Sequence, residues 1–308
     1  MDTSTKPQRL SKNLKLFTFG LITFIVLLVV AFGLYIPYAK AYALVHPERK
    51  PNTQSPADFG IVDYENVTFS TSDNITLKGW YIAPKNNAIV VFVHGHRSNR
   101  SQYLRYLEMV YAQGYGALLF DLRNHGESGG TLTTLGLKET EDAENAVRFA
   151  LSRVPNAHIA LYGHSMGAGV SLLAAAETPE VDAVIVESPF TSLEDNINDG
   201  VRELTGLPPF PFAPLVVFFA EWQVGNGLRT VRPIDAIGKI SPRPVLLVHG
   251  EKDLVFSANN SRKLFAAAKE PKELYIIPDV GHAGFLDAKP NRFPKTVLTF
   301  LDTYLKKP

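Results

Sequence analysis

The chain has 308 residues, of which 45% are hydrophobic and 20% charged, and its net charge is +1. This is the balance of an ordinary globular protein, and it offers no basic surface of the kind that nucleic-acid binding needs, so we expect no nucleic-acid partner. The chain contains no cysteine, which excludes a thiol nucleophile, disulfide bonds, thiolate metal sites and cysteine lipidation.

The first predicted element is an uncharged apolar segment, Leu16–Ile36 (LFTFGLITFIVLLVVAFGLYI). As a helix it would be about 31 Å long, which matches the hydrocarbon core of a bilayer. Its Leu, Ile, Phe and Val residues each favour insertion by roughly 0.3–0.6 kcal/mol near the centre of a helix. We therefore predict a transmembrane helix at 16–36, so that the membrane is one partner of the chain.

The charges around this helix predict its orientation. Four basic residues precede it with only Asp2 against them, namely Lys6, Arg9, Lys12 and Lys15, whereas the charges that follow it are mixed. The positive-inside rule predicts that residues 1–15 are cytoplasmic and that the large domain is extracytoplasmic.

A cleaved signal peptide is the alternative interpretation of the same segment. Ala39-Lys40-Ala41 resembles a cleavage site, and cleavage there would make Tyr42 the first residue. The apolar run is longer than the 7–15 residues typical of a signal peptide, which favours an uncleaved signal anchor.

The remaining chain predicts a linker at 37–60 and one domain at 61–308. Residues 37–60 are polar, rich in proline and without periodicity. Tyr64–Ser70 and Ile75–Ala83 alternate apolar and polar residues and predict an antiparallel hairpin. Six later segments are short and continuously apolar, as in strands covered by helices on both faces: Ala88–Val93, Tyr115–Phe120, His158–Tyr162, Ala183–Val186, Pro244–Val248 and Glu273–Ile277.

Segments with helical spacing alternate with these strands. This alternation predicts an α/β fold with a doubly wound, mostly parallel sheet. The stretch at about 189–238 interrupts it with several prolines and many aromatic residues, and it predicts a small helical lid over the strand ends.

The pattern G-x-S-x-G occurs at Gly163-His164-Ser165-Met166-Gly167, after one predicted strand and at the start of a helix. In this context it is a nucleophile elbow, in which a serine occupies a strained turn and the glycines let strand and helix pass closely. Ser165 is the predicted nucleophile.

A serine nucleophile needs a base, and the base needs an acid to orient it. In this architecture the acid and then the histidine follow the serine on loops after later strands. Asp253 follows the strand that ends near Val248, and His282 follows the next strand. Ser165, Asp253 and His282 are therefore the predicted catalytic triad.

The oxyanion hole of such a site needs two backbone N–H groups. The first candidate is the amide of Met166, which follows the nucleophile directly. The second is the amide of His96, because His94-Gly95-His96 follows the buried strand at Ala88–Val93.

Taken together, the motifs resemble the α/β-hydrolase superfamily from about Asn66 to the C-terminus. They are the elbow, His94-Gly95, the Asp253 loop, Gly281-His282, and Asp121-Leu122-Arg123-Asn124-His125-Gly126-Glu127-Ser128. Within the superfamily the chain is similar to a membrane-anchored branch with a prolyl-oligopeptidase-like core. The resemblance implies that Asp121 and Arg123 hydrogen-bond a structural turn beside the nucleophile.

Several residues have competing interpretations. Asp279 and Glu187 are alternative acids, although Asp279 shares the loop of His282 and Glu187 follows a different strand. His94 and His96 form an H-x-H pair, but the wider metallohydrolase pattern is absent, so a loop role is favoured and we predict no metal or organic cofactor. His249 is interpreted as a packed residue at a strand end.

The predicted activity is hydrolysis of small-molecule carboxylic esters, with lipid or lysophospholipid-type esters favoured by the anchor and the apolar lid. The alternatives are a serine peptidase or aminopeptidase of prolyl-oligopeptidase type and a catalytically silent, membrane-tethered binding module. Phe218, Phe219 and Trp222 of the lid either line an acyl pocket or pack the lid onto the core, and periodicity cannot distinguish these roles.

Overall fold

The computed structural model describes residues 8–206 and 208–306, so residues 1–7 of the predicted cytoplasmic segment and Leu207 of the predicted lid lie outside it. The described residues form an eight-stranded sheet in the order β1-β2-β4-β3-β5-β6-β7-β8. The strands are β1 (Glu65–Ser70), β2 (Thr76–Ile82), β3 (Ala88–Val93), β4 (Gly116–Phe120), β5 (His158–His164), β6 (Val181–Glu187), β7 (Val245–Gly250) and β8 (Lys272–Ile277).

The pairing of the strands confirms the predicted fold class. β1 pairs with β2, and β2 with β4, in antiparallel orientation. Every other neighbouring pair is parallel. β3, β4 and β7 are buried along their whole length because helices cover both faces of the sheet.

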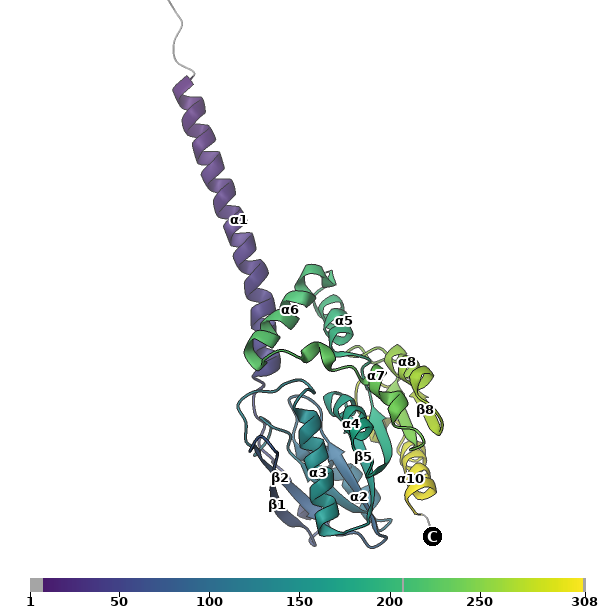
Figure 1. Cartoon of the computed structure of the whole chain (residues 1–308). Helices are drawn as coiled ribbons and strands as arrows, with labels where there is room; N and C mark the ends of the chain where they lie inside the picture. The colour runs from purple at the N-terminus through teal and green to yellow at the C-terminus, as the bar shows by residue number, and fades with distance from the viewer. Residues whose placement is uncertain (1–7, 207, 307–308) are drawn as a thin grey trace, which may run out of the picture.

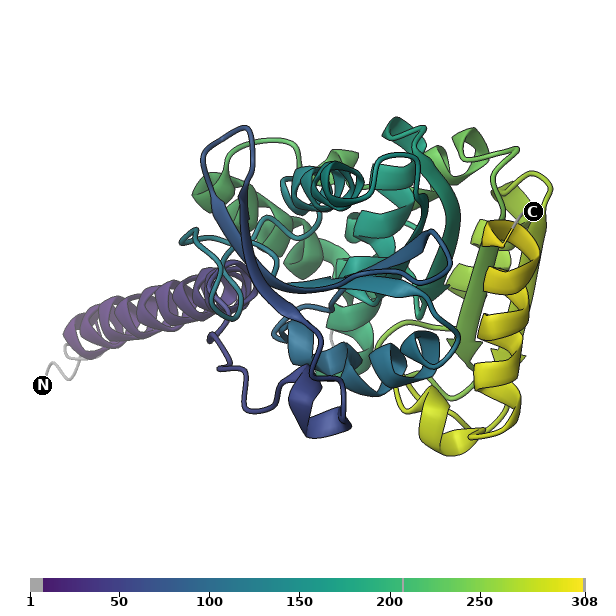
Figure 2. The same cartoon turned by 90° about the horizontal axis from the view of Figure 1, so that it is seen from below.

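The helices lie on both sides of the twisted sheet (Figure 2). They are α1 (Gln8–Val45), α2 (Leu104–Tyr111), α3 (Glu139–Arg153), α4 (Met166–Glu177), α5 (Leu193–Thr205), α6 (Pro209–Val224), α7 (Pro233–Ala236), α8 (Asn259–Ala267), α9 (Phe285–Ala288) and α10 (Arg292–Leu305). Short 3-10 helices occur at η1 (Pro56–Phe59), η2 (Arg100–Tyr103), η3 (Leu228–Thr230) and η4 (Ile237–Lys239). α3, α4 and α8 bury apolar side chains on one face of the sheet, and α2 and α10 on the other.

α1 is one continuous helix of 38 residues, about 57 Å long at 1.5 Å per residue. It projects from the domain, and most of its side chains are exposed (Figure 1). Its stretch from Lys12 to Val45 is long and apolar enough to cross a membrane.

The end of α1 differs from the prediction of a linker that starts at residue 37. The helix continues through Pro37 to Val45. Pro37, Ala41 and Val45 are buried at four-residue spacing, which makes one stripe along the helix. Ala41 and Val45 share an apolar cluster with α6, so the last turns of α1 belong to the domain.

The segment after α1 is also bound to the domain. The carbonyl oxygen of Val45 accepts a hydrogen bond from the amide of Thr133 at 2.8 Å. Arg49 donates to the carbonyl of Ser128 at 2.7 Å, and Asn99 Nδ2 donates to the carbonyls of Lys50 and Pro51 at 3.0 Å. Residues 44–51 therefore do not form a free tether.

The predicted interruption of the fold at about 189–238, hereafter the insertion, contains α5, α6 and α7. α6 packs on the domain and on α1 through four side chains at the i, i+3, i+4 and i+7 spacing of one helix face: Ala213, Val216, Val217 and Ala220. α5 and α6 lie on the side of the domain from which α1 projects (Figure 1).

Candidate active site

Ser165 lies between the last residue of β5 and the first residue of α4. Its φ of 57° and ψ of −119° are a strained conformation for a residue with a side chain. A Cβ atom at Gly163 would collide with the carbonyl oxygen of Gly167, and one at Gly167 with that of Val93. Both positions therefore require glycine, and the turn holds the serine side chain at the C-terminal edge of the sheet.

The structure brings the three predicted triad residues together in one hydrogen-bonded chain. Ser165 Oγ lies 2.9 Å from His282 Nε2, and His282 Nδ1 lies 2.7 Å from Asp253 Oδ2. Asp253 follows β7 and His282 follows β8, so two neighbouring parallel strands deliver them to the same edge. In this arrangement Nδ1–H donates to the carboxylate, and Nε2 is free to accept the proton of the serine.

Asp253 is held by four donors. Oδ1 accepts the amides of Val255 and Phe256 at 2.8 and 2.9 Å, and Oδ2 accepts Nδ1–H of His282 and lies 3.1 Å from Nε2 of His249. Burial alone would raise the pKa of Asp253, but the hydrogen bonds from His249 and His282 outweigh it and hold the pKa well below its usual range. The carboxylate is therefore ionised at any working pH.

His249 is a residue whose role the sequence did not reveal. It is fully buried, its Nδ1 lies 2.7 Å from Ser261 Oγ, and its Nε2 lies 2.8 Å from the carbonyl oxygen of Phe256. The carbonyl can only accept, so Nε2 carries a hydrogen, and Nδ1 is paired with the hydroxyl group of Ser261. The ring therefore orients the Asp253 loop. Its position four residues before Asp253, at the end of a buried strand, was the available signal.

The loop of His282 is fixed through its own carbonyl group. That oxygen accepts a hydrogen bond from Ser188 Oγ at 3.0 Å and lies 2.9 Å from His164 Nε2. The rings of His164 and Phe256 also pack edge-on against the imidazole of His282. His164, the variable position of the elbow, thus helps to position the base.

The two alternative acids lie elsewhere. Glu187 is fully buried at the end of β6 and accepts the hydroxyl groups of Tyr162 at 2.6 Å and Tyr106 at 3.2 Å. Burial raises the pKa of Glu187 to about 8, so it is neutral at pH 7. Asp279 is exposed and pairs with Lys252 at 2.8 Å. Of the three candidate acids, Asp253 is the one bonded to His282.

The two predicted oxyanion donors are the amides of Met166 and His96, and both belong to segments that border Ser165. Met166 is the first residue of α4, so its amide has no acceptor within the helix. The loop of His96 reaches the serine, since a Cβ atom at Gly95 would be 3.4 Å from Ser165 Cβ. The imidazole of His96 is turned away, with Nε2 2.8 Å from the carbonyl oxygen of Leu44 at the end of α1.

The polar residues around this loop are structural. His94 Nε2 accepts the amide of Leu122 at 3.0 Å. Asp121 accepts the amide and the guanidinium of Arg100 at 2.7 and 3.0 Å, and Arg123 pairs with the buried Asp142 at 2.6 Å. The interpretation of Asp121 and Arg123 as loop residues is confirmed. Their hydrogen bonds hold the turn that follows β4.

Either a pocket role or a packing role was open for the three aromatic residues of the insertion, and the structure shows their surroundings on α6. Phe218 and Trp222 are exposed, and the ring of Phe219 packs edge-on against Tyr38 of α1 with 5.6 Å between centroids. Phe218 and Trp222 are exposed because the opposite face of α6 packs on the domain.

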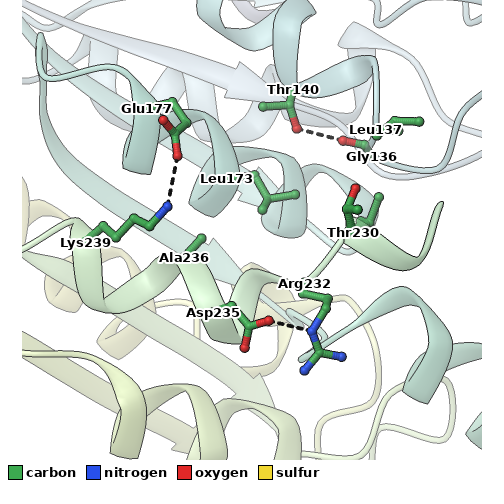
Figure 3. Close-up of a pocket in the computed structure, with 11 residues that line it drawn as sticks. Gly136, Leu137, Thr140, Leu173, Glu177, Thr230, Arg232, Asp235, Ala236 and Lys239 are labelled. Atoms are coloured by element: carbon green, nitrogen blue, oxygen red, sulfur yellow. Dashed lines mark hydrogen bonds and ion pairs between the residues drawn. The ribbon is translucent and has the colours of Figure 1, made fainter. Parts of the chain in front are cut away.

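No triad residue lines either of two cavities that lie among the described residues. The first, of about 290 Å³, lies between the start of α3, α4 and the segment from Thr230 to Lys239, and ion pairs of Glu177 with Lys239 and of Arg232 with Asp235 lie at its walls (Figure 3). The second, of about 340 Å³, lies between α5, the start of α6 and α8.

Known proteins are similar to this chain in sequence and in fold. The family described as "Serine aminopeptidase, S33" matches residues 84–226. YqkD of Bacillus subtilis (strain 168) is 30% identical over 230 residues, which are 73% of this chain and 75% of YqkD. YfhR of Escherichia coli (strain K12) is 30% identical over 267 residues, which are 83% of this chain and 85% of YfhR.

Among solved structures, the esterase Pf2001 of Pyrococcus furiosus is similar, with a TM-score of 0.72 and 26% identity over 85% of this chain and 98% of that chain. By its sheet topology, its nucleophile elbow and these relatives, the chain belongs to the α/β-hydrolase superfamily.

Proposed function

We propose that the protein is a serine hydrolase that cleaves carboxylic esters through Ser165, His282 and Asp253. The observation that carries this proposal is the hydrogen-bonded chain from Ser165 Oγ through His282 to Asp253 at a strained strand–turn–helix elbow. The similarity to the esterase Pf2001 supports an ester substrate. The same hydrogen bonds disfavour a catalytically silent binding module.

The chemistry follows from these positions. Ser165 Oγ attacks the ester carbonyl carbon while His282 Nε2 takes its proton, and Asp253 stabilises the imidazolium that forms. The amides of Met166 and His96 stabilise the oxyanion. His282 then returns the proton to the leaving alcohol. In the second half of the reaction His282 takes a proton from the attacking water and returns it to Ser165 Oγ as the carboxylic acid is released. No cofactor takes part in the proposed steps.

A serine aminopeptidase is the second candidate, favoured by the description of the family that matches residues 84–226. The prolyl-oligopeptidase-like core that the motifs resemble would support the same alternative. Amides need more protonation of the leaving group than esters do. A triad histidine can protonate either leaving group, so the triad geometry alone does not separate the two substrates. The substrate panel below separates them.

A fluorophosphonate probe and a substrate panel test these proposals. We expect the full-length protein to be labelled, Ser165→Ala to remain unlabelled, and p-nitrophenyl esters to be cleaved while aminoacyl p-nitroanilides are not. Cleavage of the anilides but not of the esters would make the protein a peptidase. Absence of labelling in the folded wild-type protein would contradict both enzymatic proposals.

We also propose that α1 is an uncleaved signal anchor with the N-terminus in the cytoplasm and the catalytic domain extracytoplasmic. The basic residues before the apolar stretch support this orientation. Burial of Ala41 against α6 supports retention of the helix, because cleavage after Ala41 would remove part of a packed interface.

Limited proteolysis tests this topology. Protease added to intact spheroplasts should digest the domain and spare a tag placed before residue 8. Protection of the domain would reverse the orientation, and a mature N-terminus at Tyr42 would identify a cleaved signal peptide.

A further inference from the structure

The outward face of α6 consists of large apolar side chains that the domain does not cover. Phe218 is 59% exposed and Trp222 72%, one turn apart on the helix, and Phe210 at the kink in its first turn is 78% exposed. The single charged residue of α6 is Glu221, and its carboxylate is turned back toward the 3-10 helix η3, 3.8 Å from Arg229. An uncharged aromatic surface of this kind marks an interaction site.

The contact between α6 and α1 fixes where this surface lies. The ring of Tyr38 packs on Phe219 at 5.6 Å and on Trp222 at 6.5 Å between centroids. Tyr38 comes just after the predicted transmembrane stretch 16–36, whose length of about 31 Å equals that of the hydrocarbon core. Trp222 is therefore at the level where the apolar core of a bilayer gives way to the headgroups, which is where tryptophan and tyrosine are enriched.

The end of α1 cannot swing freely away from α6. Ala41 and Val45 are buried in one cluster with α6, and the carbonyls of Leu44 and Val45 are bonded to His96 and Thr133. α5 and α6 are also the part of the domain nearest to the free stretch of α1 (Figure 1). When α1 spans a bilayer, the aromatic face of α6 must lie close to its surface.

We propose that Phe210, Phe218 and Trp222 lie in the boundary between headgroups and acyl chains of the bilayer that α1 spans, and that ester substrates reach Ser165 from that bilayer. The substrate class is then an amphiphilic carboxylic ester whose acyl chain stays in lipid until it enters the site. This substrate class rests on the proposed esterase function, whereas the membrane contact does not.

The first test uses the two tryptophans of the chain. Trp80 is 3% exposed in the sheet and Trp222 is 72% exposed. The full-length protein is reconstituted into phosphatidylcholine vesicles, with or without lipids brominated near the headgroup end of the acyl chain. We expect bromine to quench the emission of Trp222, and the Trp222→Phe variant to lose the quenchable part while the Trp80 emission remains.

Two results would overturn the membrane contact. In the first, brominated and plain vesicles give the same Trp222 emission, and aqueous iodide quenches it fully. In the second, bromine has no effect and cross-linking joins the α6 faces of two chains, which would make a second copy the occupant.

The second test separates the membrane route from the chemistry. We expect the double variant Phe218→Ser, Trp222→Ser to lower turnover of long-chain esters dispersed in vesicles about tenfold, and to leave turnover of a soluble acetate ester unchanged. Val62→Ser is the matched control, because Val62 is an equally exposed apolar residue, 73% exposed, that precedes β1.

The outcomes are distinguishable. Equal loss on both substrates, or no loss on either, would overturn the membrane route. A wild-type protein that shows bromine quenching but cleaves no ester would refute the esterase function and leave the membrane contact in place.

Discussion

The variant Ser165→Ala is expected to lose ester turnover by on the order of 10⁴–10⁶-fold, because the members of a triad act as a unit and the remaining groups have no nucleophile to activate. His282→Ala should cost about as much. The measurement is kcat for a soluble p-nitrophenyl ester, with circular dichroism to show that the variant is folded. The elbow geometry should persist, since the strained turn is enforced by Gly163 and Gly167 rather than by the serine hydroxyl.

Ser171→Ala is the matched control for that variant. Ser171 lies on α4, two turns after the elbow, and its buried hydroxyl has no hydrogen-bond partner among the described residues. Its removal should leave kcat unchanged. A Ser165→Ala protein with near wild-type turnover would show that another group forms the acyl-enzyme.

The variant Asp253→Asn is expected to lower kcat on the order of 10³–10⁴-fold. The asparagine would be isosteric with Asp253, but it could not hold His282 with Nδ1 protonated and Nε2 free, and it would not stabilise the imidazolium. KM should change little, because the acid does not touch substrate.

Glu187→Gln is the control for that assignment, and it should also change how the free energy of unfolding depends on pH. Because Glu187 does not contact His282, activity should be retained. Burial raises the pKa of Glu187 from 4.5 to about 8. Its contribution to the free energy of unfolding is therefore complete below pH 4.5 and is lost as the pH rises toward 8. The loss is at most roughly 1.4 kcal/mol per pH unit.

The free energy of unfolding should therefore be similar for Glu187→Gln and the wild type at pH 4, and higher for the variant at pH 9. If Glu187→Gln were inactive while Asp253→Asn retained activity, the acid of the triad would be Glu187.

The sequence was informative wherever local chemistry determines structure. The elbow follows from glycines that no other residue could replace, and the parallel strands follow from continuous apolar runs that only a sheet covered on both faces can bury. Asp253 and His282 could be assigned because neighbouring parallel strands end at one edge.

What the sequence could not supply were contacts between distant segments. Helix α6 is apolar almost all around, so periodicity could not show that Phe218 and Trp222 lie opposite the buried face. The sequence predicted a linker from residue 37. The turns that follow Pro37 instead pack on α6, which is far away in the chain, and the helix extends to Val45. The position of His249 before Asp253 did not reveal its partners, because folding brings Ser261 to one ring nitrogen and Asp253 to the other.

The continuous helix at the end of α1 has a consequence for how the enzyme meets its substrate. A random coil over residues 37–60 would have an end-to-end distance of about 25–30 Å, and the domain could move over that range relative to its anchor. With α1 in a bilayer as proposed, a helix that enters the domain without a break would instead keep Ser165 at a nearly constant height above the lipid. Under the proposed ester hydrolysis, encounters would then occur by lateral diffusion in the plane of the membrane, and the rate would depend on the mole fraction of ester in the surface rather than on its amount in solution.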